Sequence, residues 1–159
     1  MTRYVVAEAD AFLEGEIRRV EVAGREICLV RAGDEFFALM DRCPHGGARL
    51  SGGRLGGAVE SDGPGHYRLC RRGEMLKCPW HGWEYDVRTG QSWSDPASTR
   101  TRAYATRAVA GGELVKGPYV ADTVPIEVEG RYVVVELPDS SRRRAAAPGS
   151  ESRKTSEAR

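Results

Sequence analysis

Long apolar runs are missing from this 159-residue sequence, and none approaches the roughly 20 residues that a membrane-spanning helix needs. No signal-peptide core follows the first residues, which lead directly into a strand-like segment. The net charge is only +1, so it suggests neither a nucleic acid nor an anionic membrane as partner. These absences predict a cytoplasmic protein, in which the four cysteines are reduced or bound to metal rather than bridged.

Two nucleotide-binding signatures are also missing. Neither G-x-x-x-x-G-K-[ST] nor a G-x-G-x-x-G after a strand occurs, so the glycines between 52 and 65 are interpreted as turn residues rather than phosphate-binding loops. Over the whole chain, 19 glycines and eight prolines favour many turns and few long helices. The length predicts one domain with a hydrophobic core.

Two short segments concentrate the residue types that bind metals. CPHGGARL occupies residues 43–50 and CPWHGWEYD occupies residues 78–86. Each contributes one thiol and one imidazole, which gives four candidate ligands: Cys43, His45, Cys78 and His81. The neighbouring proline and glycine residues permit tight turns, so we expect two ligand loops held face to face.

Two metal chemistries fit a set of two cysteines and two histidines. Structural zinc fingers usually space their ligands as C-x(2-4)-C followed by H-x(3-5)-H, with like residues in each pair. Here each pair is mixed. A Rieske-type [2Fe–2S] centre places two thiolates on one iron and two imidazoles on the other. Two mixed pairs favour this binuclear centre, and the residues alone leave a zinc site open.

The two segments resemble the cluster-binding boxes of the Rieske iron–sulfur family, C-P-H-x-G-A and C-P-W-H-G-W-x-Y-D. The resemblance covers about residues 5–137 and is specific in the boxes. It implies one [2Fe–2S] cluster per chain, with Cys43 and Cys78 on the buried iron and His45 and His81 on the outer iron. It also implies a surrounding set of residues that shield or tune the cluster: Pro44, Gly46, Gly47, Leu50, Trp80, Gly82, Trp83 and Tyr85.

Departures from the high-potential members of that family indicate the branch. Those members carry one further cysteine in each box, and the two form a disulfide. This sequence has Ala48 and Trp80 at those positions. Trp83 replaces their serine donor, while Tyr85 stands where their tyrosine donor would be. The resemblance therefore implies the low-potential, oxygenase-type branch.

The implied fold is all-β, an antiparallel β-sandwich base that carries an inserted, small cluster-binding subdomain. We expect residues 1–137 to form this domain, with the subdomain at about 41–91, and the Arg/Ser/Ala-rich tail 138–159 to be disordered. Segment 10–14 is at most one helical turn, and the glycines between 52 and 65, segment 71–73 and Gly111-Gly112 are expected to be turns. The β-branched and aromatic runs predict strands at 4–7, 17–22, 26–31, 35–40, 66–70, 74–77, 102–109, 123–128 and 131–137.

The remaining cysteines and histidine are not expected to bind metal. Cys28 lies in an apolar run and is interpreted as a buried small hydrophobe. His66 and Cys70 match neither box, and Cys70 is expected to be an exposed thiol that is sensitive to oxidation. Four basic residues near the second box suggest a solvated hairpin or, alternatively, a docking patch for an acidic redox partner: Arg68, Arg71, Arg72 and Lys77.

Function depends on what accompanies the cluster. A terminal Rieske oxygenase also needs a mononuclear iron held by two histidines and a carboxylate, and His66 alone cannot complete that site. The resemblance thus implies an electron carrier with no substrate-converting site, the ferredoxin component of a ring-hydroxylating oxygenase system, with a reductase and an oxygenase as redox partners. One alternative is the small Rieske-like subunit of a nitrite reductase or of another oxidoreductase. The other is a zinc-stabilised binding module without a redox role.

Overall fold

The computed structural model describes residues 1–114, 117–121 and 129–139, and within them the strands form three sheets. The first sheet has the order β10-β1-β11-β9 and consists of β1 (Thr2–Glu8), β9 (Thr106–Ala110), β10 (Tyr119–Val120) and β11 (Arg131–Leu137). The second has the order β2-β3-β4-β8 and consists of β2 (Ile17–Val22), β3 (Arg25–Ala32), β4 (Glu35–Met40) and β8 (Ala103–Tyr104). All pairs in these two sheets are antiparallel except β1 with β10.

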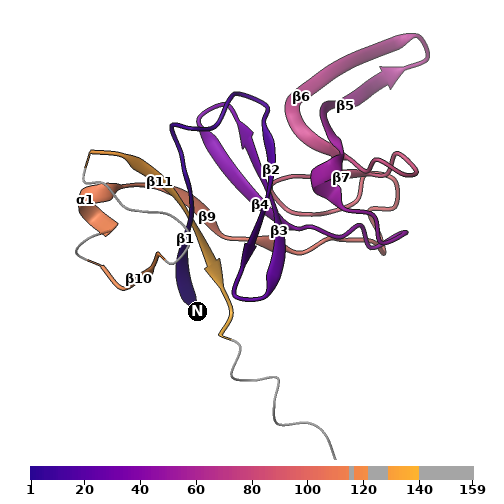
Figure 1. Ribbon diagram of the computed structural model, residues 1–159. Helices are drawn as coiled ribbons and strands as arrows, with labels where there is room; N and C mark the ends of the chain where they lie inside the picture. The colour runs from indigo at the N-terminus through magenta and orange to yellow at the C-terminus, as the bar shows by residue number, and fades with distance from the viewer. Residues whose placement is uncertain (115–116, 122–128, 140–159) are drawn as a thin grey trace, which may run out of the picture.

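A third, smaller sheet belongs to a separate lobe. It has the order β5-β6-β7 and consists of β5 (Arg54–Gly63), β6 (His66–Lys77) and β7 (Glu84–Asp86). A short 3-10 helix, η1 (Leu50–Gly52), precedes β5, and a single helical turn, α1 (Gly111–Leu114), follows β9. In Figure 1 the lobe lies at one end of the molecule and the first sheet lies at the other, with β2, β3 and β4 between them.

Strand β3 explains why the lobe and the base hold together. Ile27 and Leu29 belong to the core between the two base sheets, whereas Cys28 and Val30 belong to the core shared with the lobe. Because side chains alternate along a strand, β3 contributes one face to each core and reads as a continuous apolar run. The all-β prediction, with a sandwich base and a small lobe, is confirmed. No helix in the described part of the chain is long and apolar enough to cross a membrane.

The inter-box segment differs most from the expectation. Segments 66–70 and 74–77 are not two strands joined by a turn but one strand, β6, which pairs with a strand that we did not predict, β5. The register jumps from Ala58↔Cys70 to Gly56↔Met75, so residues 71–74 form a bulge in β6. Position 57 lies inside β5 and requires glycine, because an added Cβ there would stand 2.6 Å from the carbonyl oxygen of Cys70. The resulting β5–β6 hairpin projects from the lobe as an arm (Figure 1).

Smaller differences lie at the sheet edges. The predicted strand 102–109 is two strands, β8 and β9, because the chain passes from the second sheet to the first at Ala105. Gly111-Gly112 begins α1 instead of a turn, and segment 10–14 forms turns without a helix. The predicted strand 123–128 lies outside the described residues. Pro138 and Asp139, which we assigned to the tail, contact Arg25 and the N-terminal residues, and the rest of the tail lies outside the described residues.

Candidate metal centre

The two predicted ligand loops have the same construction. In the first loop, which follows β4, the Cys43 N–H donates to the carbonyl of Ala48, and Gly47 N–H donates back to Cys43 at 2.8 Å. In the second loop, which follows β6, Cys78 N–H donates to Trp83 at 2.7 Å and Gly82 N–H donates back to Cys78 at 3.1 Å. Each turn contains a glycine with positive φ, +81° at Gly47 and +71° at Gly82. Each cysteine therefore sits at the base of a tight turn.

The structure sorts the four candidate ligands into two pairs. Cys43 and Cys78 are buried, with 1% and 3% of their surface exposed, and Cys43 is near enough to raise the pKa of Cys78. His45 and His81 are exposed, and their ring centroids lie 5.0 Å apart at an interplanar angle of 86°. The loops thus bring the thiols together inside the lobe and the imidazoles together at its surface.

Hydrogen-bond donors surround the sulfurs. Burial alone would raise the pKa of the Cys43 thiol, but the Tyr85 hydroxyl and the backbone N–H groups of Gly46 and His45 stabilise its thiolate, and the net pKa is lowered. Burial and the neighbouring Cys43 sulfur raise the pKa of Cys78, although the N–H groups of Trp80 and His81 oppose them. Backbone N–H groups from both loops are therefore directed at the sulfur pair.

Aromatic residues from the second loop border the pair of imidazoles. Trp83 stacks on His45 with ring centroids 4.2 Å apart, and Trp80 meets His81 edge to face at 6.3 Å. Trp80 is 65% exposed, so it lies beside the histidines at the surface rather than covering them. Gly46 lets His81 approach, since an added Cβ would lie 3.3 Å from the imidazole.

The remaining predicted neighbours are divided between surface and interior. Pro44 is exposed on the first loop, while Leu50 is fully buried beneath it. Tyr85 is also fully buried, and its hydroxyl lies 3.1 Å from Cys43 Sγ. Burial is the main cause of the raised pKa of this phenol, followed by the adjacent Cys43. A protonated hydroxyl that points at sulfur is therefore built into the site.

A buried carboxylate supports the first loop from below, and sequence reasoning missed it. Asp41 is 2% exposed and accepts hydrogen bonds of 2.6 Å from both the backbone N–H and the hydroxyl of Ser51. It thereby joins the start of the first loop to η1. The only sequence signal was its position two residues before Cys43.

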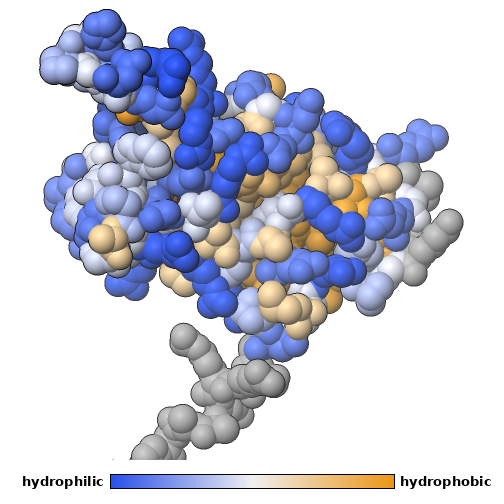
Figure 2. Space-filling model, turned by 180° about the vertical axis from the view of Figure 1, so that it is seen from behind, coloured by the Kyte–Doolittle hydropathy of each residue, from blue (hydrophilic) through white to orange (hydrophobic). Residues whose placement is uncertain are grey.

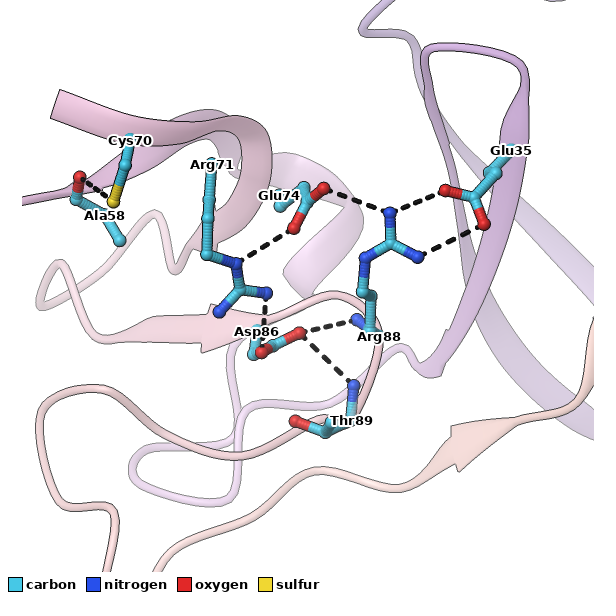
Figure 3. A network of polar contacts seen from close by, with 8 residues as sticks. All are labelled: Glu35, Ala58, Cys70, Arg71, Glu74, Asp86, Arg88 and Thr89. Carbon is cyan, nitrogen blue, oxygen red and sulfur yellow. Dashed lines mark hydrogen bonds and ion pairs between the residues drawn. The ribbon is translucent and has the colours of Figure 1, made fainter.

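A polar network joins β6 and β7, the two strands that flank the second loop (Figure 3). Arg71 binds Asp86 at 2.7 Å and Glu74 at 2.9 Å. Arg88 binds Glu74 at 3.0 Å and reaches across to Glu35 on β4. The network therefore connects the bulge of β6, the end of β7 and the base. Arg71 has a φ of +47°, unusual for a residue with a side chain, and its two ion pairs hold it there.

The other sequence predictions have mixed outcomes. Cys28 is fully buried as expected, and His66 is exposed on the arm. The expectation of an exposed Cys70 is wrong, because its thiol is half-buried, donates to the Ala58 carbonyl, and has a pKa raised by burial and by Glu60.

The positive charge of the basic cluster at Arg68, Arg71, Arg72 and Lys77 is largely neutralised in the folded chain. Arg68 binds Glu60 at 2.7 Å, Lys77 binds Glu84 at 3.2 Å, and Arg71 belongs to the network in Figure 3. Three of its four members therefore bind carboxylates of this same chain. This pairing favours the solvated hairpin over a docking patch for an acidic partner.

The donor set fits a binuclear cluster. Within the described residues, no three His, Cys, Asp or Glu side chains converge closely enough to hold one metal ion. The sulfur pair and the imidazole pair are instead separated as buried and exposed, as two metal atoms with unlike ligands require. The N–H and O–H donors around the sulfurs suit the acceptors of an iron–sulfur centre.

Comparisons with known proteins agree with this geometry. The description "Rieske [2Fe-2S] domain" matches residues 2–105. The chain is 31% identical over 113 residues to ferredoxin CarAc of Metapseudomonas resinovorans, covering 70% of this chain and 91% of that protein. It is 37% identical over 103 residues to the anthranilate 1,2-dioxygenase ferredoxin subunit of Burkholderia cepacia, covering 64% and 80%. A solved complex of reduced oxygenase and oxidized ferredoxin in carbazole 1,9a-dioxygenase contains a chain that is 25% identical, with a TM-score of 0.54 and coverage of 86% and 97%.

Proposed function

The chain belongs to the Rieske [2Fe–2S] domain family, and from this premise we propose that it carries single electrons from a reductase to a terminal oxygenase. Its similarity to ferredoxin components of dioxygenase systems supports the proposal, as does the oxygenase–ferredoxin complex among the related structures. These comparisons do not favour the nitrite reductase subunit or the zinc module.

The cofactor is a Rieske-type [2Fe–2S] cluster, which accepts and releases one electron when bound. We assign Cys43 and Cys78 to the inner iron and His45 and His81 to the outer iron. The separation into a buried thiol pair and an exposed imidazole pair is the observation that supports this assignment. Pro44, Gly46, Gly47, Leu50, Trp80, Gly82, Trp83 and Tyr85 would shape or cover the site.

The buried thiols and the exposed imidazoles have different roles in the proposed function. Cys43 and Cys78 are kept from water, and hydrogen bonds to their sulfurs disperse negative charge. His45 and His81 present their ring edges at the surface, which gives a docked protein its shortest approach. Trp80 offers an exposed aromatic surface beside His81 on which such a protein can pack. We therefore assign electron transfer to the histidine edge.

We also infer a cytoplasmic location. Cys28 and Cys70 are free thiols, and neither belongs to the proposed ligand set. Free thiols persist where the compartment is reducing.

Metal analysis and two matched pairs of variants test the assignment. Purified protein should contain about two iron atoms and two acid-labile sulfides per chain, without stoichiometric zinc. Cys43→Ala and His81→Ala should each abolish the visible absorption and the EPR signal of the reduced protein. Cys70→Ala and His66→Ala remove the same residue types from the arm, so they should keep both signals.

Two results would contradict the assignment. One is full colour and an unchanged EPR signal in Cys43→Ala or His81→Ala. The other is one zinc ion per chain in place of iron, which would restore the zinc-stabilised module. A colourless Cys70→Ala or His66→Ala protein would instead place a ligand on the arm.

A further inference from the structure

Strand β5 is an outer edge of its sheet. It is the outermost strand in the order β5-β6-β7, and it is ten residues long. Across its outer side the described residues contribute no backbone hydrogen bond to it. Edge strands in native proteins are commonly blunted by lysine, proline or shortness. β5, with the sequence RLGGAVESDG, is long and has no lysine or proline, and its charged residues are Arg54, Glu60 and Asp62. Its pairing with β6 is irregular at Gly56/Ala58 and Ser61/Gly63.

The arm also carries exposed apolar side chains on one face. Val59 pairs directly with Leu69, and Ser61 pairs with Tyr67, so these residues share a face of the hairpin. Val59, Leu69 and Tyr67 are 59%, 49% and 71% exposed. The arm stands clear of the body, as Figure 2 shows from behind, so both the edge and this face are accessible.

The charges on β5 indicate what covers its edge. Its carboxylate at Glu60 already binds Arg68. Arg54 and Asp62 lie near opposite ends of β5 and form no ion pair with the described residues. They are separated by eight residues with Ala58 midway, so an antiparallel copy of β5 centred on Ala58 would place Arg54 opposite Asp62 twice.

We propose that the protein forms a two-fold symmetric dimer in which β5 pairs antiparallel with β5 of a second copy, Ala58 facing Ala58. The same surface on both copies is self-complementary, as a two-fold interface requires. The four strands β6, β5, β5 and β6 would then form one intermolecular sheet, a strand addition of the kind seen in peptide recognition. The pairing uses no residue of the two ligand loops.

Side-chain sizes fit this register. Val59 of each copy lies opposite Gly57 of the other, and Glu60 lies opposite Gly56. An added Cβ at Gly56 would meet nothing closer than 4.0 Å, so the packing of this chain by itself does not require glycine there. Glycine within a strand often marks the close approach of another backbone. The apolar faces of the two arms would join along Val59 and reduce their exposure.

Sedimentation velocity on the full-length holoprotein tests the proposal. Wild-type protein should sediment as twice the 17.4 kDa chain at high micromolar concentration and dissociate on dilution. Arg54→Asp and Asp62→Arg each create two like-charge pairs across the interface, and each should raise the dissociation constant about tenfold or more. Arg72→Asp makes the same charge change on β6 and should leave the dissociation constant unchanged.

A mixture of the two variants tests the register. In a heterodimer of Arg54→Asp with Asp62→Arg, both cross-strand pairs again join opposite charges. The two proteins should therefore be monomeric separately and dimeric when mixed. A register centred on Gly57 would instead place Arg54 opposite Glu60, and Asp62→Arg would then have no effect.

Three outcomes would contradict the β5–β5 dimer. A wild-type protein that stays monomeric up to millimolar concentration overturns the proposal and leaves the arm to another partner. A wild-type dimer that both variants preserve, or a mixture that stays monomeric, overturns the β5 interface. The iron content and visible absorption of the variants should equal those of wild type, so a failure here is distinct from a failure of the proposed electron-carrier function.

Discussion

The hydroxyl of Tyr85 is a single atom with a measurable consequence. It lies 3.1 Å from Cys43 Sγ in a fully buried position. Such a bond stabilises negative charge on sulfur, and negative charge on the site grows when it is reduced. With a net value of about 0.5–1.5 kcal/mol for the bond, Tyr85→Phe should lower the reduction potential by about 20–60 mV. Protein-film voltammetry measures it directly.

Tyr104 provides the matched control for that substitution. It is also a buried tyrosine, but its hydroxyl finds no hydrogen-bond partner within the described part of the chain. Tyr104→Phe should therefore leave the potential unchanged and not destabilise the protein. An equal shift in both variants would show that the Tyr85 hydroxyl does not tune the site.

At the scale of single residues, the sequence identified the candidate ligands but not the residues that hold them in place. The mixed C-x-H and C-x-x-H pairs set Cys43, His45, Cys78 and His81 apart, and Cys28, His66 and Cys70 belong to no such pair. Asp41 could not be recognised, because its role depends on Ser51, ten residues away, folding back over it.

Among the turns, Gly90 has a stricter requirement than its neighbours. Its φ is +73°, and an added Cβ would stand 2.1 Å from the carbonyl oxygen of Thr101. Gly24 has a similar φ of +69° with nothing within 4 Å. Gly24→Ala should cost about 1 kcal/mol through backbone strain alone, whereas Gly90→Ala should cost about 3 kcal/mol or more. Urea unfolding of the two holoproteins compares them, and equal losses would contradict the close approach.

The network in Figure 3 predicts a pH-dependent contribution from Glu74. Hydrogen bonds from Arg88 and then Arg71 lower the pKa of this carboxyl despite its partial burial. A carboxylate with a lowered folded-state pKa stabilises the protein above its unfolded pKa of about 4.3, and this stabilisation is lost as the pH falls through the folded value. Glu74→Gln should therefore reduce the free energy of unfolding by about 1 kcal/mol at pH 7, with a shrinking difference toward pH 3.

Glu60→Gln is the control for this pH series. Glu60 pairs with Arg68 on the exposed arm, where solvent screens the interaction. Arg68 lowers the pKa of Glu60 as well, but solvent weakens this exposed pair, so Glu60→Gln should reduce the free energy of unfolding at pH 7 less than Glu74→Gln does. A constant difference for Glu74→Gln from pH 7 to pH 3 would mean that packing, and not the carboxylate charge, accounts for the effect.

Elements of the base could be predicted, and the arm could not. The β-branched and aromatic runs predicted the bounds of β2 and β4 to the residue. We did not predict β5, because Gly56 and Gly57 are typical of turns. Glycine at position 57 is explained only by the nearby Leu69 side chain and Cys70 carbonyl, which the folded structure places there. The bulge at 71–74 likewise depends on ion pairs to β7 and the base, which no local pattern encodes.

At the scale of the whole molecule, we expect the stability of its two hydrophobic cores to depend unequally on the cluster. The core between the base sheets contains Val133, Val135 and Leu137 and none of the candidate ligands. The core of the lobe includes Cys43 and Cys78 themselves, packed with Leu76 and Tyr85. Metal binding and folding are coupled where the ligands belong to the packed interior. The base should therefore hold its structure when the lobe loosens.

Hydrogen–deuterium exchange on holoprotein and on chelated, iron-free protein tests this difference. Amides of residues 43–50 and 75–87 should exchange at least tenfold faster without the cluster, since the lobe opens locally. Amides of β1 and β11, which pair from Thr2↔Leu137 to Glu8↔Tyr132, should keep their protection. Uniform loss of protection would mean that the two cores unfold as one unit, and unchanged protection of the lobe would mean that the ligand loops are held by packing and hydrogen bonds alone.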